Sequence, residues 1–119
     1  MVHHGAALAQ ESGQPALAEA VASGDIDMLP GRLPILLRYA VKLTLAPWEV
    51  QEQDLAPMRA AGLSDRDIVD ANQVVGYYNY VNRVADGLGV ELEPRWPPDL
   101  RGPRTYAVRK RWRAARSQR

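Results

Sequence analysis

Two adjacent imidazoles open the chain, at His3 and His4, and they are its two histidines. An imidazole titrates near neutral pH and is also the commonest metal ligand in proteins, so the pair suggests either proton transfer or metal binding. Neighbouring residues of a helix point about 100° apart and do not converge on one ion. We therefore interpret the pair as partly solvated side chains, and the sequence predicts no metal site and no cofactor.

Cysteine is absent from all 119 residues. For the chain as it stands, this excludes disulfides, thiolate metal sites and a cysteine nucleophile. Any thiol chemistry needs sulfur from another source.

Three polar side chains interrupt an otherwise apolar stretch, at Asn79, Asn82 and Arg83. Their spacing of three and four residues places them on one face of a helix. They either line a pocket or satisfy carbonyls and carboxylates at a helix or subunit interface, and we favour this structural role because it is the commoner one. Asp86 follows Arg83 at the spacing of an ion pair within a helix.

Aromatic side chains gather in the same stretch, at Tyr77, Tyr78 and Tyr80. We expect core or interface packing with the hydroxyls at the edges, in preference to stacking on a substrate. Of the three tyrosines, Tyr78 is kept as a candidate pocket-lining residue together with Asn79, Asn82 and Arg83.

The elements that must position these residues are all predicted to be helices, because no alternating strand pattern of useful length occurs. Proline in first turns, glycine after last turns and apolar residues at helical spacing define five of them. Pro57 indicates an early start or a kink in the fourth helix. The predicted ranges are 5–10, 15–23, 34–45, 50–61 and 65–88.

The last predicted helix has the clearest start, with Ser64 as N-cap and Asp67 as the capping-box carboxylate. Its apolar residues cover more than one face, which predicts burial against a partner chain or against missing sequence. We therefore expect the isolated chain to associate or to be poorly soluble. The expected inner stripe is Ile68, Ala71, Val75, Tyr78, Val81, Ala85 and Leu88, widened by Val69, Val74, Tyr77 and Val84.

The charge pattern divides the chain. Residues 1–94 carry 6 basic and 13 acidic side chains, whereas residues 95–119 carry 9 basic and 1 acidic. The length suits one small domain, so we predict a helical domain over 1–93 and a proline-rich linker with a basic tail over 94–119. The tail is predicted to be solvated, or to bind nucleic acid phosphates without sequence preference at most. No apolar run is long enough for a membrane span and no signal peptide is visible, which predicts a cytoplasmic protein.

Three stretches resemble a known family: HHGAAL (3–8), GLSDRDIVDA (62–71) and VGYYNYVNRVADGLGV (75–90). They are similar to the C-terminal half of peroxidase-related proteins in the carboxymuconolactone decarboxylase and alkylhydroperoxidase D-like superfamily. The resemblance spans nearly all of residues 1–94 and leaves the basic tail outside. It implies an all-α bundle that assembles into homo-oligomers.

The resemblance also implies an antioxidant oxidoreductase that reduces peroxides through a Cys-x-x-Cys pair followed closely by a relay histidine. A thiol with a lowered pKa attacks a peroxide oxygen as the thiolate and becomes a sulfenic acid, which the second cysteine resolves as a disulfide. His4 matches the relay histidine, with His3 beside it. The two cysteines, an upstream glutamate and further N-terminal helices would all precede Met1, so either the start codon has been assigned too far downstream or the gene is truncated.

The sequence is thus interpreted as a C-terminal part of a peroxidase-related protein, and it is predicted to be inactive because it contains no cysteine. Its expected partner is a second copy of itself, and a peroxide is a substrate only if upstream cysteines exist. The alternative is a non-catalytic helical oligomerisation module with a basic tail. A third hypothesis is decarboxylase-like or isomerase-like chemistry, as in some cysteine-free relatives.

Overall fold

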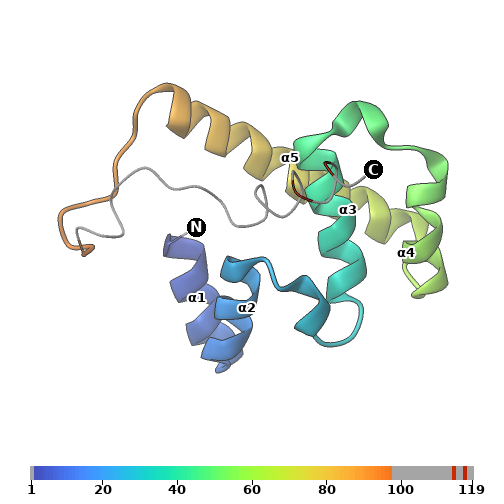
Figure 1. Ribbon diagram of the computed structural model, residues 1–119, viewed down its shortest axis with the longest axis horizontal. Helices are drawn as coiled ribbons and strands as arrows, with labels where there is room; N and C mark the ends of the chain where they lie inside the picture. Colours follow the sequence, from blue (N-terminus) through green and yellow to red (C-terminus); the bar gives the residue numbers. More distant parts are fainter. Residues whose placement is uncertain (1, 98–113, 115–116, 118–119) are drawn as a thin grey trace. The chain divides into compact units, whose positions relative to one another are not determined.

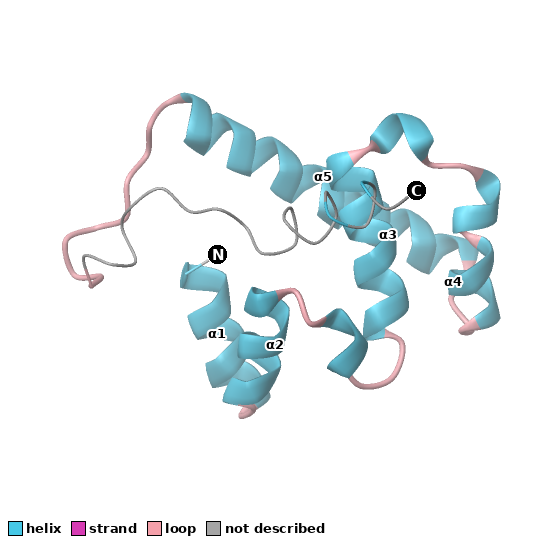
Figure 2. Cartoon of the chain, in the orientation of Figure 1, coloured by secondary structure: helices cyan, strands magenta, loops and turns pink. Residues whose placement is uncertain are grey.

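The computed structural model describes residues 2–97, 114 and 117, with side chains from residue 4 onward. Every regular element in this part of the chain is helical, which confirms the all-α prediction (Figure 1, Figure 2). Two compact units are distinguished, residues 1–29 with 91–119 and residues 30–90, and each is described by itself. Most of the predicted linker and of the basic tail lies outside the described residues. Among the described helices, none has the length and apolar character needed to cross a bilayer.

The first unit contains a helical hairpin. Gly13 lies between its helices with a φ of +64°, a conformation that glycine adopts without a steric penalty. Pro15 occupies the first turn of the second helix and Gly24 caps its end in the left-handed conformation, both as predicted. The elements are α1 (Val2–Ser12), α2 (Pro15–Ser23) and a 3-10 turn, η1 (Ile26–Met28).

The second unit places two long helices against each other and closes one end with short turns. Its core is Tyr39, Met58, Leu63 and Ile68, of which Met58 is completely buried. Tyr39 comes from the first long helix and Ile68 from the second, so the core fixes how the two pack. The elements are α3 (Leu33–Leu45), the 3-10 turns η2 (Pro47–Glu49) and η3 (Glu52–Asp54), α4 (Ala56–Ala60) and α5 (Asp65–Gly87).

Of the helix predicted over 50–61, the structure has only the later part as an α-helix, which is α4 (Ala56–Ala60). Pro57 lacks an N–H and its ring clashes with a preceding turn, so it is accommodated in the first turn of α4. The chain before it forms η3 instead, whose start is closed by Asp54 Oδ2 accepting from the Gln51 N–H at 2.7 Å. Gly62 follows with a φ of +82° and reverses the chain, as expected after a helix end.

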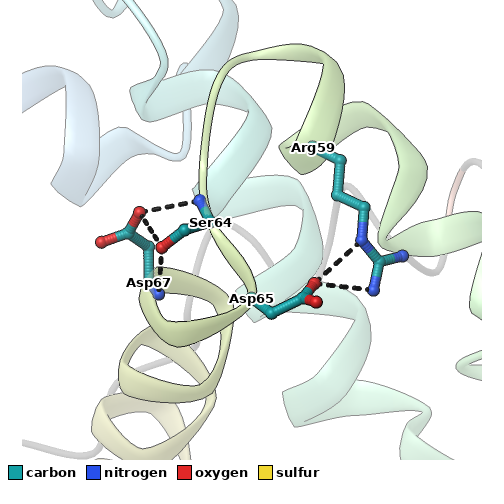
Figure 3. Close-up of polar contacts among 4 residues, drawn as sticks. All are labelled: Arg59, Ser64, Asp65 and Asp67. Atoms are coloured by element: carbon teal, nitrogen blue, oxygen red, sulfur yellow. Dashed lines mark hydrogen bonds and ion pairs between the residues drawn. The ribbon is translucent and has the colours of Figure 1, made fainter.

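The start of α5 carries the predicted capping box (Figure 3). Ser64 Oγ accepts from the Asp67 N–H at 3.2 Å, and Asp67 Oδ2 accepts from the Ser64 N–H at 2.8 Å and from its hydroxyl at 2.7 Å. These hydrogen bonds from Ser64 hold the pKa of the Asp67 carboxyl below its ordinary value of 3.8. Beside the cap, Arg59 pairs with Asp65 at 3.0 Å and links α4 to α5.

The lowered pKa of Asp67 predicts an acid-sensitive contribution to stability. Because the folded carboxyl has a lower pKa than the unfolded one, its stabilisation is complete above about pH 5 and is lost as the pH falls through the folded pKa. We expect the Asp67→Ala variant to lose less of its free energy of unfolding between pH 5 and pH 2 than the wild type does. Urea titrations followed by circular dichroism measure this, with Asp70→Ala on the same helix as the control. An Asp70→Ala effect as large as that of Asp67→Ala would contradict the assignment.

Candidate functional site

Two of the three predicted polar residues meet the C-terminal end of α3. Asn79 Nδ2 donates to Thr44 Oγ1 at 3.1 Å, and Arg83 donates to the backbone carbonyls of Asn79 at 3.0 Å and Thr44 at 3.5 Å. Carbonyls in the last turn of a helix have no partner within the helix and carry the negative end of its dipole. The guanidinium therefore caps α3 from outside, while Asn82 is exposed.

This arrangement differs from the ion pair that the sequence suggested. In the part of the chain that the structure describes, Arg83 and Asp86 form no salt bridge, because the guanidinium is directed to the two carbonyls. A carbonyl at a helix end is a fixed acceptor, whereas an exposed ion pair adds little in water.

A further amide contact was not anticipated. Asn72 Nδ2 donates to the hydroxyl of the buried Tyr39 at 2.7 Å. Asn72 lies seven residues before Asn79, so the two amides share one face of α5, two turns apart. That spacing was the available signal in the sequence, but it does not reveal which side chains of α3 receive the hydrogen bonds.

A second unanticipated contact joins η3 to α3. Lys42 Nζ lies 2.7 and 2.6 Å from the two carboxylate oxygens of Asp54. Its hydrogen bond is the main reason that the pKa of Asp54 is lowered from 3.8, with the Gln51 N–H second. The Lys42–Asp54 pair is only partly exposed, and it holds η3 against α3.

The histidines belong to the other unit. His4 lies in the first turn of α1 and is exposed. The side chain of His3 lies outside the described residues. Within the described part of the chain, no group of three or more histidine, cysteine, aspartate or glutamate side chains is arranged to hold a metal ion. The structure thus groups Asn79 and Arg83, and describes His4 separately.

The aromatic residues of α5 are more exposed than predicted. Tyr77 and Tyr78 meet edge to face with ring centroids 5.4 Å apart. Of the expected inner stripe, Ile68 is buried, but Tyr78 is 39% and Leu88 is 77% exposed. The reason is that α3 and the short elements cover only one side of α5 in this unit, which leaves its remaining apolar residues without a cover among the described residues.

One shallow surface depression lies over η3 and α4. It is lined by Glu52, Gln53, Ala56 and Arg59. None of the predicted site residues lines it, so it gives no support for a pocket beside Asn79.

The chain is similar to a protein of solved structure. This is an uncharacterized peroxidase-related protein from Silicibacter sp. TM1040, with 38% sequence identity and a TM-score of 0.72. The match covers 80% of this chain but 50% of that protein, so the chain spans half the length of its structural neighbour. No protein-family model matches the chain, and the search of curated proteins found no match. The chain therefore has the fold of part of a peroxidase-related protein.

The two neighbouring amides of α5 provide a matched test of the contact with α3. We expect Asn79→Ala to lower the free energy of unfolding by about 1 kcal/mol, because it removes one hydrogen bond and leaves Thr44 Oγ1 without that donor. Asn82→Ala changes the same side chain at an exposed position, so we expect less than about 0.5 kcal/mol. Thermal and urea unfolding followed by circular dichroism measure both. Equal losses in the two variants would show that the Asn79 contact does not stabilise the fold.

Proposed function

We propose that this chain is the C-terminal helical part of a thiol peroxidase of the carboxymuconolactone decarboxylase and alkylhydroperoxidase D-like superfamily. The observation that supports the proposal is the similarity to a peroxidase-related protein over 80% of this chain, at 38% identity. The match spans half of that protein. We assign the remainder of the machinery to sequence ahead of His3, because in the family that the chain resembles the cysteine pair precedes the histidines.

In the proposed reaction a Cys-x-x-Cys pair, encoded ahead of His3, supplies the sulfur. A thiolate attacks one peroxide oxygen, the oxygen–oxygen bond breaks, and a sulfenic acid forms while water or an alcohol leaves. The second thiol then displaces water from the sulfenic acid and forms a disulfide, which a dithiol reductant opens again. We assign the proton transfer to His4, which accepts the thiol proton and returns it to the leaving oxygen.

The position of His4 suits this role. It lies in the first turn of α1 and its side chain is exposed. In the motif of the family that the chain resembles, the cysteine pair lies near the N-terminal end of a helix, where the partial positive charge lowers a thiol pKa. His3 is assigned a supporting role beside it.

The rest of the chain serves as scaffold in this proposal. Residues 1–93 form the helical domain and residues 94–119 a linker and basic tail. Asn79 and Arg83 hold α5 to the end of α3, and Asn82 and Tyr78 remain the candidates for lining a pocket in the longer protein. We place the protein in the cytoplasm, as a homo-oligomer.

A second candidate function is a non-catalytic helical oligomerisation module. It is favoured by the large apolar side chains of α5 that are exposed in the chain, among them Tyr77 and Tyr80 at 62% and 68%. Exposed apolar surface of this extent is typical of an interaction site. The two candidate functions are distinguished by whether a Cys-x-x-Cys pair is encoded ahead of His3.

The peroxidase proposal is tested with two proteins. We expect the 119-residue chain to consume hydrogen peroxide or an alkyl hydroperoxide, with a dithiol reductant, no faster than a heat-inactivated sample, since it contains no thiol. A longer protein, translated in frame upstream of Met1 and containing Cys-x-x-Cys before His3, is expected to turn over. In it, His4→Gln should reduce kcat by about 10²-fold or more through loss of proton transfer.

The matched control is His3→Gln in the same longer protein, which should have a smaller effect. Catalytic turnover by the 119-residue chain would contradict the proposal. An upstream reading frame without the cysteine pair would also contradict it and would leave the oligomerisation module as the function.

A further inference from the structure

The free side of α5 carries a regular apolar seam. We define the apolar seam as Val74, Tyr77, Val81, Val84 and Leu88, whose successive spacings are three, four, three and four residues. Tyr77 and Leu88 are 62% and 77% exposed, and Val81 is half-buried. Alternating steps of three and four residues are the spacing with which one helix packs along another in a coiled coil.

The apolar seam lies away from the helix that already covers α5. Asn72, Asn79 and Arg83 mark the side of α5 that meets α3 through hydrogen bonds. At 100° per residue, the apolar seam is centred about 160° around the helix from these three residues. Figure 1 shows the C-terminal end of α5 continuing past α3, beyond the contacts that Asn79 and Arg83 make with Thr44. A partner helix can therefore reach the seam without displacing α3.

We propose that the apolar seam binds the same seam of a second copy of this chain, with the two α5 helices antiparallel and crossing at Val81. The inference specifies the interface of the proposed homo-oligomer and does not depend on the peroxidase chemistry. Pairing about Val81 places Val74 of one copy against Leu88 of the other. The seam is then self-complementary, as a twofold interface requires.

The charges next to the apolar seam favour the antiparallel direction. Asp70, four residues before Val74, continues the seam spacing and is exposed beside Arg66. In a parallel pair the two Asp70 carboxylates would face each other, and like charges brought together in an interface are destabilising. In the antiparallel pair, Asp70 faces position 92 of the other copy, beyond the end of α5 at Gly87. The flanking positions Tyr78 and Tyr80 add aromatic surface and no charge.

The exposed area matches what a small specific interface needs. With about 150–250 Å² for a whole aromatic side chain, the exposed parts of the apolar seam and its flanking tyrosines come to roughly 600 Å² per copy. Two copies then bury on the order of 1,200 Å², the lower limit for specific protein interfaces. We therefore expect a reversible dimer whose population depends on protein concentration.

Sedimentation velocity of the full 119-residue chain, over a range of concentrations, tests the interface. We expect monomer–dimer exchange in the wild type. A charge on either side of the central Val81, in Tyr77→Glu or Val84→Glu, should raise the dissociation constant by at least about thirtyfold, as the loss of a central interface residue does. Ala56→Glu adds the same charge at an exposed position of α4 and should leave the dissociation constant unchanged. Circular dichroism verifies that each variant keeps its helix content.

Single cysteines test the direction of the pair, because the chain contains no cysteine of its own. Under mild oxidation, Val81→Cys is expected to form a disulfide-linked dimer. A mixture of Val74→Cys and Leu88→Cys is expected to give the mixed dimer in excess over either symmetric one.

A wild type that stays monomeric at all concentrations would overturn the inference. Self-association that Tyr77→Glu and Val84→Glu leave intact would also overturn it, while the proposed homo-oligomer would stand with another interface. If the disulfides form mainly between two Val74→Cys chains and between two Leu88→Cys chains, the antiparallel arrangement is refuted.

Discussion

The packing of α5 against α3 is the interaction on which the second unit depends. Tyr39 contributes twice to it: its ring lies in the core with Met58 and Ile68, and its hydroxyl accepts a hydrogen bond from Asn72 on α5. An apolar contact alone would permit the helices to slide or rotate, since burial has no direction. The hydrogen bond fixes the rotation of α5, and Asn79 fixes its position along α3 two turns later. The turns after α3 are in turn held by the Lys42–Asp54 pair.

Fixing α5 on one side leaves its other side free, and this links the fold to the proposed assembly. The four other elements of this unit, α3, η2, η3 and α4, are too short to surround a 23-residue helix, so a row of valines, tyrosines and a leucine stays exposed. The proposed reaction uses a different part of the chain, His4 on α1. Scaffold and proton relay are therefore assigned to separate elements, and the sulfur to sequence ahead of both.

Local sequence rules predicted most of the helix ends. Pro15, Gly24, Gly62 and the Ser64–Asp67 box each act through the backbone within a few residues, so no distant contact is needed to recognise them. The prediction was wrong over 50–61, where helical spacing of Leu55, Met58 and Ala61 suggested one helix. Pro57 limits that helix to a short segment because its ring does not fit later in a helix, and two 3-10 turns precede it.

By itself the sequence determined the helical class, the strong start of α5 and the lack of sulfur for thiol chemistry, because each of these follows from residue type or from neighbours within one or two turns. Only the tertiary structure decided which face of α5 is covered. The apolar residues of that helix extend around more than one side, so periodicity does not distinguish the side that meets α3 from the side that stays exposed. The choice comes from Thr44 and Tyr39, which are 35 and 33 residues away from Asn79 and Asn72, and from the hydrogen bonds that these pairs form.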